Sequence, residues 1–133
     1  MIISNKKPDL ELPGLQFKYW NEATEIDDLL QFTIGIMPLK KDVWSEGKCG
    51  FKLVQYSALG LPSVTTPVGV NKKIVDQGLT GFLCESEGEW FSALKNLIEN
   101  KCLRHELGDK GRKKMAAEYS IQANAGVFLG LFN

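Results

Sequence analysis

Residues 47–62 read GKCGFKLVQYSALGLP, and this stretch says the most about how the chain folds. A glycine-rich turn leads into a predicted helix over residues 51–59, which Gly60 and Pro62 end ahead of a strand. Glycine lets a backbone approach a ligand closely, and the N–H groups at the start of a helix attract anions. The pattern therefore predicts an anion-binding turn in front of a helix.

Two lysines accompany this turn. Lys48 lies within it, and Lys52 lies in the first turn of the predicted helix, three positions before Gln55, so that Lys52 and Gln55 can point the same way. A cation near a helix N-terminus is unfavourable for the helix itself. An anion between the two lysines, such as a diphosphate, explains their presence better.

Strand signals recur along the chain. The apolar run at 34–37 ends at Pro38 and predicts a parallel strand that is buried on both faces. A polar loop is predicted over 40–50, and a turn over 67–71. Further strands are predicted at 2–4, 15–20, 63–66 and 81–84.

Helix signals alternate with these strands. Asn21 or Thr24 can cap a first helix with Ile26, Leu29 and Leu30 on one face, and Ser86 and Glu89 have capping-box spacing for a later one. Other helical segments are predicted at 51–59, 72–77, 103–107 and 110–119, ahead of an apolar tail over 121–132. The order predicts an α/β fold, a Rossmann-like three-layer sandwich with a mostly parallel sheet.

In sheets of this type, ligands bind outside the carboxyl ends of the strands. The loop 40–50 and the turn 66–71 both follow predicted strands. We therefore expect the two to meet at that edge of the sheet.

The composition is that of one soluble globular domain over residues 1–133. The 16 basic and 16 acidic residues cancel, which argues against bulk electrostatic binding to nucleic acid or to an anionic membrane. No apolar run approaches the roughly 20 residues of a membrane span. The scattered Cys49, Cys84 and Cys102 suggest neither a disulfide framework nor a zinc site, and a reducing, cytoplasmic location fits them best.

Five segments, in this order and spacing, resemble the C-terminal donor-binding domain of a GT-B glycosyltransferase of the large retaining family 4, group 1 type. They are residues 34–39, 47–56, 58–62, 66–71 and 78–83. The resemblance becomes less distinct toward the C-terminus but covers most of the chain. It implies transfer of a sugar from a nucleotide diphosphate sugar to an acceptor, with no metal and no cofactor.

The resemblance assigns the main donor contacts to the glycine-rich turn and its helix. Lys52 lies where the family has its phosphate lysine, and Lys48 adds a second cation, so both are expected to stabilise the leaving diphosphate. Gln55 lies where the family has a glutamate that binds the ribose, and a second family glutamate would fall near Gly47. Both acidic residues are missing here, which leaves the nucleotide preference open.

The rest of the expected donor site comes from the turns. Besides Gln55, the residues expected to bind the nucleotide sugar are Met37, Pro38, Leu39, Gly47, Cys49, Gly50, Thr66, Pro67, Val68, Gly69 and Asn71. Residues 37–39 would flank the base or ribose, and residues 66–71 would line the sugar and phosphate pocket. Trp44 can either stack on a base or sugar or cover a core.

Two parts of the family's enzymes have no counterpart in this sequence: the first strand-helix unit of the donor domain and the acceptor-binding domain. We therefore expect that this chain alone transfers no sugar, whether it is a fragment, a truncated reading frame or a subunit. The tail over 121–132 is very apolar. In the family the last helix packs on the other domain, and without a partner it would favour self-association. Packing on its own sheet is an equal alternative.

A second hypothesis is a non-catalytic, truncated domain that serves protein association, which the missing glutamates favour. Taken outside the matched segments, Lys52 and Gln55 fit a solvated helix face, and His105 fits a surface role. The dinucleotide-binding glycine pattern and the Walker A phosphate loop are both absent from the sequence. A flavodoxin-like or receiver-like domain would need an acidic pocket or a flavin-phosphate loop, and neither is found.

Overall fold

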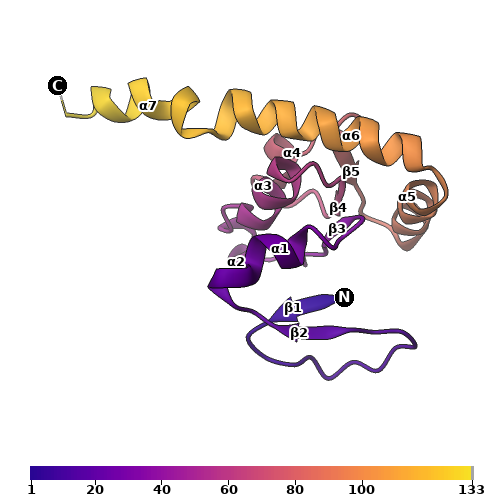
Figure 1. Cartoon of the computed structure of the whole chain (residues 1–133). Coiled ribbons are helices and arrows are strands. Elements are labelled where there is room, and N and C mark those ends of the chain that lie inside the picture. Colours follow the sequence, from indigo (N-terminus) through magenta and orange to yellow (C-terminus); the bar gives the residue numbers. More distant parts are fainter. Residues whose placement is uncertain (133) are drawn as a thin grey trace. The chain divides into compact units, whose positions relative to one another are not determined.

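The structure is a computed structural model that describes residues 1–132 of the chain (Figure 1). The chain forms two compact units, a first one over Met1–Phe32 and a second one that begins at Thr33. Each unit has its own parallel sheet. The single-domain organisation predicted for 1–133 stays a prediction.

The first unit is built on a two-stranded parallel sheet. Strand β1 (Ile2–Ser4) pairs with β2 (Phe17–Tyr19). The 3₁₀ helix η1 (Glu22–Thr24) and helix α1 (Glu25–Leu29) follow. Both strands and the helical segment lie where the sequence predicts them.

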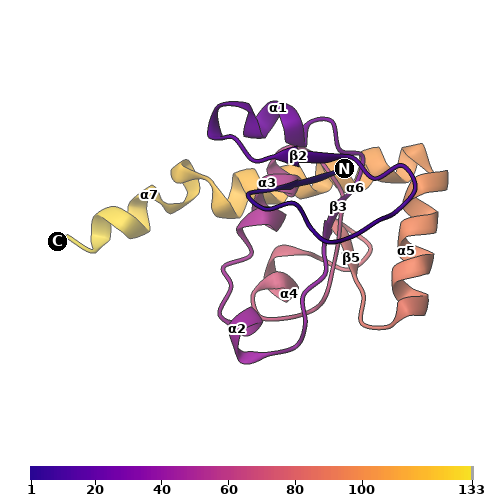
Figure 2. The same cartoon turned by 90° about the horizontal axis from the view of Figure 1, so that it is seen from below.

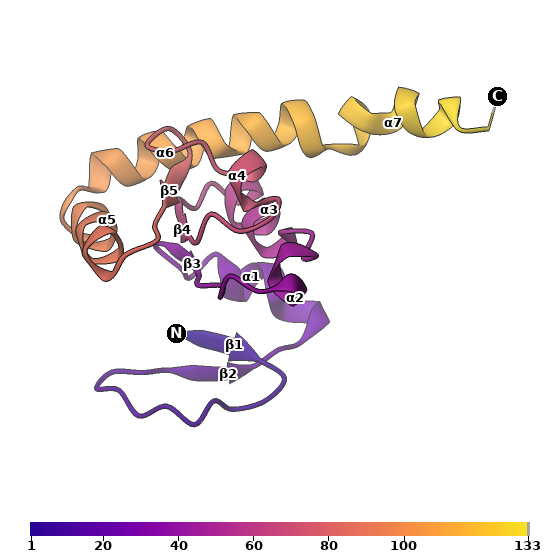
Figure 3. The same cartoon turned by 180° about the vertical axis from the view of Figure 1, so that it is seen from behind.

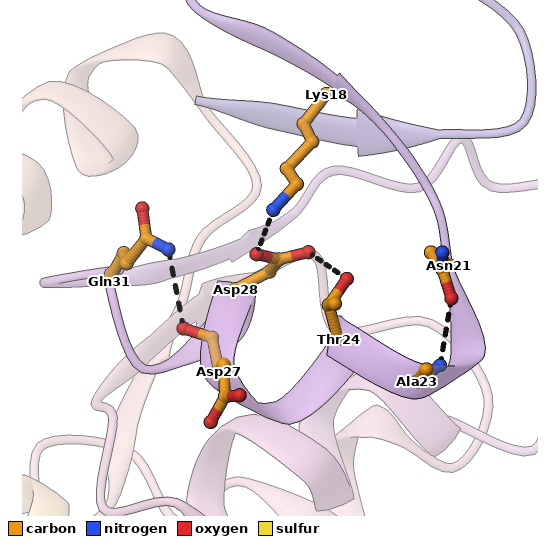
Figure 4. A network of polar contacts seen from close by, with 7 residues as sticks. All are labelled: Lys18, Asn21, Ala23, Thr24, Asp27, Asp28 and Gln31. Carbon is orange, nitrogen blue, oxygen red and sulfur yellow. Dashed lines mark hydrogen bonds and ion pairs between the residues drawn. The ribbon is translucent and has the colours of Figure 1, made fainter.

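Polar contacts hold the helical segment of the first unit (Figure 4). Asn21 caps η1, since its side-chain oxygen accepts the N–H of Ala23 at 2.9 Å. Asp28 is 1% exposed, and its carboxylate accepts hydrogen bonds from Lys18 and from the hydroxyl of Thr24. The hydrogen bond from Lys18 is the main cause that lowers the pKa of the Asp28 carboxyl, so this buried group stays ionised at neutral pH.

The second unit is built on a three-stranded parallel sheet in the order β3-β4-β5. Its elements, in chain order, are β3 (Gly35–Met37), α2 (Val43–Glu46), α3 (Phe51–Ala58), β4 (Ser63–Thr65), α4 (Asn71–Ile74), β5 (Gly81–Leu83), α5 (Glu87–Glu99), α6 (Lys101–Lys114), the π-helix η2 (Met115–Tyr119) and α7 (Ile121–Gly130). The predicted α/β class and parallel strand pairing are confirmed.

Helices α3 and α5 lie on opposite sides of this sheet (Figure 2 and Figure 3). The face toward α3 carries Gly35, Ser63 and Gly81, which stand opposite one another in register. A Cβ on Gly35 would lie 2.3 Å from the ring of Tyr56 on α3. The absence of a side chain at Gly35 therefore makes room for this ring, whose burial raises the pKa of Tyr56.

The opposite face of the sheet contributes to the main apolar core. Val64, at the centre of β4, packs in one cluster with Ala93 and Leu97 of α5 and with Leu107 of α6. Burial of one such aliphatic side chain typically contributes about 1.5–3 kcal/mol. The predicted capping box at the start of α5 is confirmed, since the Ser86 side chain and the carboxylate of Glu89 each accept a backbone N–H of the other residue.

Helix α6 packs closely along the end of α3. A Cβ on Gly108 would lie 2.0 Å from the carbonyl oxygen of Gly60, and one on Gly111 would lie 3.5 Å from the Ser57 side chain. The prediction of two separate helical segments at 103–107 and 110–119 is wrong, because α6 continues through Gly108 and Gly111 without a break. The small size of these two glycines allows α6 to pack closely against the end of α3, and the glycines do not end the helix.

Helix α7 extends away from the body of the second unit, beyond the end of η2 (Figure 1 and Figure 3). None of its residues is buried. The side chains of Ile121 and Val127 are 84% and 73% exposed. The alternative that the apolar tail packs on its own sheet is therefore wrong.

Three local predictions also need correction. Ile36 is 46% exposed, because β3 is an edge strand of the described sheet, so the segment 34–37 is not buried on both faces. The loop 40–50 contains α2, a single helical turn that Asp42 caps. On the first predicted helix Leu29 is buried, but Ile26 and Leu30 are exposed.

Gly35→Ala should lower the free energy of unfolding by about 1–3 kcal/mol, the usual cost of overpacking, because the new methyl group meets the Tyr56 ring. Urea denaturation followed by circular dichroism measures this change. Gly88→Ala is the matched control, since nothing lies within 4 Å of a Cβ there and alanine favours helix α5. Equal unfolding midpoints for both variants would contradict the close packing of α3 on the sheet.

The Asp28 carboxyl should titrate below its ordinary value of 3.8 in an NMR pH titration. Because its folded-state pKa is lowered, Asp28 stabilises the fold above its unfolded-state pKa, and this contribution disappears as the pH falls through the folded-state value. Lys18→Met should raise the pKa again, whereas Lys6→Met should leave it unchanged. An unchanged Asp28 pKa in Lys18→Met would show that the contact between Lys18 and Asp28 does not form.

Candidate functional site

The turns that follow β3 and β4 meet at the carboxyl ends of these strands, as the sequence predicts. The N–H of Leu39 donates to the hydroxyl of Thr66 at 3.1 Å, and the hydroxyl of Thr65 donates to the carbonyl of Met37 at 2.9 Å. Met37 and Leu39 are half-buried, and Pro38 is exposed. These bonds hold residues 37–39 beside the start of the 66–71 turn.

A second link joins α2 to the same turn. The backbone N–H of Gly69 donates to Oε2 of Glu46 at 2.9 Å. Gly69 has a φ of +52°, and a Cβ there would lie 2.7 Å from the carbonyl oxygen of Glu46, so a glycine is needed for this close approach. The turn over 47–50, which starts directly after Glu46, is therefore anchored beside the 66–71 turn.

Gly50 sets the bend at which α3 begins. It has a left-handed backbone with a φ of +68°, and a Cβ there would lie 2.3 Å from Cδ1 of Ile74. The two predicted cations lie on either side of this bend, and both have solvent access, since Lys48 is half-buried and Lys52 is exposed. The thiol of Cys49 is exposed between them. The structure thus brings these three predicted site residues together at one bend.

Two predicted site residues of the 66–71 turn are buried and support the turn from within. Asn71 is 1% exposed, and its Nδ2 donates to the hydroxyl of Thr65 at 3.0 Å and to the carbonyl of Thr66 at 3.1 Å. Val68 is also 1% exposed. Their side chains shape the turn from inside, while more accessible positions of the turn are Thr66, Pro67 and Gly69.

Gln55 lies on α3 and is half-buried. Its Oε1 is a buried atom that accepts no hydrogen bond from the described part of the chain. Buried polar atoms usually have a partner, and leaving one without costs about 1–3 kcal/mol. The position that the family resemblance assigns to ribose binding therefore has an unused acceptor.

Charged side chains surround this edge of the sheet. Asp42 caps α2, and the N–H of Ser45, at 2.7 Å, is the largest cause that lowers the Asp42 pKa, with a further effect from the charge of Lys48. Lys41 pairs with Glu85, with 2.5 Å between Nζ and Oε1, and this contact raises the pKa of Lys41. Asp42 and Lys41 are therefore both ionised at neutral pH.

The structure gives information that the sequence does not give about two residues, Glu46 and Trp44. No local sequence pattern signals Glu46, because its link to Gly69 joins residues 23 positions apart. Trp44 is 81% exposed and covers no core, so the predicted covering role is wrong, and stacking on a base or sugar stays a prediction.

A separate hollow of about 780 Å³ lies in the first unit, along the segment between its two strands and on β2. Its lining residues are Lys7, Leu10, Glu11, Leu12, Pro13, Leu15, Phe17 and Tyr19. This hollow is open to solvent, and its lining has one lysine and one glutamate but none of the predicted site residues. The turns at the strand ends carry more convergent polar groups and form the candidate site.

Metal and membrane features are not found in residues 1–132. No group of three or more His, Cys, Asp or Glu residues in this range could hold a metal ion. The expectation that the reaction needs no metal and no cofactor stays a prediction. No helix in the same range has the length and apolar character to cross a membrane.

Comparison with known proteins decides the family. Residues 5–100 match the family model described as glycosyl transferases group 1. The chain belongs to this family. The matched range contains the whole candidate site, from Met37 to Asn71. No protein of curated function matches the sequence directly.

Two solved structures share the fold. One is the C-terminal domain of a glycosyl transferase group 1 family protein, LpcC from Francisella tularensis, with a TM-score of 0.63 and 20% identity over 80% of this chain and 55% of that chain. The other is a mutant of S. aureus TarM in complex with Fondaparinux, alpha-GlcNAc-glycerol and UDP, with a TM-score of 0.70 and 20% identity over 89% of this chain and 23% of that chain. The chain thus spans about half of the first structure and about a quarter of the second.

The fold expected from the resemblance is confirmed by these comparisons. Both solved structures have the Rossmann-like α/β arrangement that the sequence predicts, and the LpcC structure is itself a C-terminal domain.

Proposed function

We propose that this chain binds the nucleotide diphosphate sugar of a retaining glycosyltransferase at the carboxyl ends of β3 and β4. The observation that carries the proposal is the bend at Gly50, which has Lys48 before it and Lys52 after it and lies beside the linked turns over 37–39 and 66–71. The family consists of sugar transferases. UDP in the TarM complex supports a nucleotide diphosphate as the class of ligand.

The two lysines suit the chemistry of this leaving group. Cleavage of the bond between the sugar and the diphosphate leaves negative charge on the diphosphate oxygens. In the proposal, Lys48 and Lys52 stabilise that charge as it develops, a kind of contact whose loss typically costs about 2.7–4 kcal/mol in the transition state. The acceptor would bind on a second domain, and this chain's side chains perform no step that needs a metal.

The proposal assigns recognition of the nucleoside to Gln55 and to residues 37–39. In the proposal, the half-buried Gln55 offers its side-chain amide to a ribose hydroxyl. Because an amide is uncharged, this hydrogen bond is weaker than one to a carboxylate at the same position. We expect the ribose to contribute less to affinity here than in family members that carry a glutamate.

We also propose that α7 packs on a partner surface, either an acceptor-binding domain or a second copy of the chain. The large apolar side chains at this end are exposed and comprise Ile121, Val127, Phe128, Leu129, Leu131 and Phe132. No residue between 121 and 132 is charged, which is unusual for a helix that faces water. An exposed apolar surface of this kind marks an interaction site. The same observation favours protein association as the second candidate function.

UDP, GDP or ADP should bind the purified chain in a calorimetric titration. Lys52→Ala should weaken that binding about tenfold or more, because a hydrogen bond to a charged group contributes about 1.5–3 kcal/mol. Lys113→Ala, which removes an exposed lysine of α6, is the control and should leave the affinity unchanged. No binding of any of the three by a folded sample would contradict the donor site and favour the association module.

The chain should self-associate in sedimentation velocity experiments at micromolar concentration if α7 pairs with a second copy. Phe128→Gln together with Leu131→Gln should then shift the population to monomer, because both apolar side chains leave the contact surface. Ile98→Gln, at an exposed apolar position of α5, should not. A chain that is monomeric at every concentration would exclude self-association and assign α7 to a partner domain.

A further inference from the structure

The hydrogen bond between Glu46 and Gly69 connects the two halves of the candidate site. Glu46 is the last residue of α2 and directly precedes the turn that carries Lys48. Its carboxylate accepts the N–H of Gly69, near the middle of the 66–71 turn, with 2.9 Å between Oε2 and N. The family resemblance gives Glu46 no role.

The bonds inside the 66–71 turn fix its shape but do not attach it to α2. The N–H of Val68 donates to the carbonyl of Thr66 at 2.8 Å, and the N–H of Asn71 donates to the carbonyl of Val68 at 3.1 Å. The Asn71 side chain also bonds within the turn, to Thr66. The Glu46 carboxylate is different because it reaches the turn from another element.

The charge of Glu46 acts on a neighbouring cation. Glu85 is the main cause of the raised pKa of Lys41, and the charge of Glu46 adds to it, so Glu46 lies within electrostatic reach of that ammonium. Oε2 of Glu46 accepts the Gly69 N–H. A role in holding the turn fits this contact better than competition with the donor.

We propose that Glu46 is a positioning residue, which holds the 66–71 turn against α2 and thereby keeps the turn and Lys48 in one arrangement for the donor. This inference rests on the proposed donor function. A site that is already arranged before binding loses less conformational freedom when the ligand arrives. Since Glu46 acts by accepting a hydrogen bond, Glu46→Gln should keep most of this function, because the amide oxygen is also an acceptor. Glu46→Ala should lose it.

The test combines amide hydrogen exchange by NMR with titration of UDP, for the unaltered chain, Glu46→Gln and Glu46→Ala. In Glu46→Ala the Gly69 amide should exchange about tenfold faster or more, while the amides of β4 keep their protection. The dissociation constant for UDP should rise about three- to tenfold, as expected for one lost hydrogen bond. Glu46→Gln should stay close to the unaltered chain in both measurements. Glu99→Ala, at the exposed end of α5, is the matched control.

The two readouts separate the inference from the function on which it rests. Unchanged Gly69 exchange in Glu46→Ala would overturn the positioning role, and tighter UDP binding would overturn it in favour of competition between the carboxylate and the donor. Equal losses in Glu46→Gln and Glu46→Ala would also overturn it, because the charge and not the hydrogen bond would then matter. If the Gly69 amide exchanges faster in Glu46→Ala but the chain binds no UDP, the result supports the link between Glu46 and the turn. It then contradicts only the proposed donor function.

Discussion

The close approach of α3 to the β3-β4-β5 sheet is the constraint on which the candidate site depends. It is possible because Gly35 has no side chain where the Tyr56 ring lies, and Ser63 and Gly81 in the same cross-strand row are also small. Lys52 stands one helical turn before Tyr56 on the same helix. A larger residue in the row would displace α3, and the lysine proposed to bind phosphate would move with it. The position of that lysine is therefore determined by a packing contact four residues away.

The rim of the site is held together in a different way, by the hydrogen bonds that its buried polar groups form with one another. The hydroxyl of Thr65 accepts from Asn71 and donates to Met37, so one buried side chain connects β3, β4 and the turn that follows. Buried polar groups that are satisfied in this way specify one arrangement, because any other arrangement would leave them without partners. The turn is thus shaped from inside the protein, and its outer surface remains accessible.

Much of the fold could be predicted from the sequence because its signals are local. The bend at Gly50, the end of α3 at Gly60 and the capping box at Ser86 each depend on residues within four positions. The errors arose where a distant contact decides. The glycines of α6 resemble helix breaks, but Gly108 is there because the carbonyl of Gly60 lies against it. The exposure of Ile36 depends on its place at the edge of the described sheet, which an apolar run cannot reveal.

The candidate site also combines features that the sequence predicts with features that it does not. One motif includes several residues, but the structure shows that some of them are exposed and others are buried. Asn71 and Lys52 both belong to segments of one family pattern, yet Asn71 is buried and bonded within the turn while Lys52 faces solvent. Only the exposed member can touch a ligand directly, and the buried one acts through the backbone it holds. Glu46 is the reverse case, since it lies outside the pattern but contacts a residue within it. Sequence resemblance therefore locates the edge where the donor is proposed to bind, and the contacts of each side chain indicate whether it would meet the donor or support those that do.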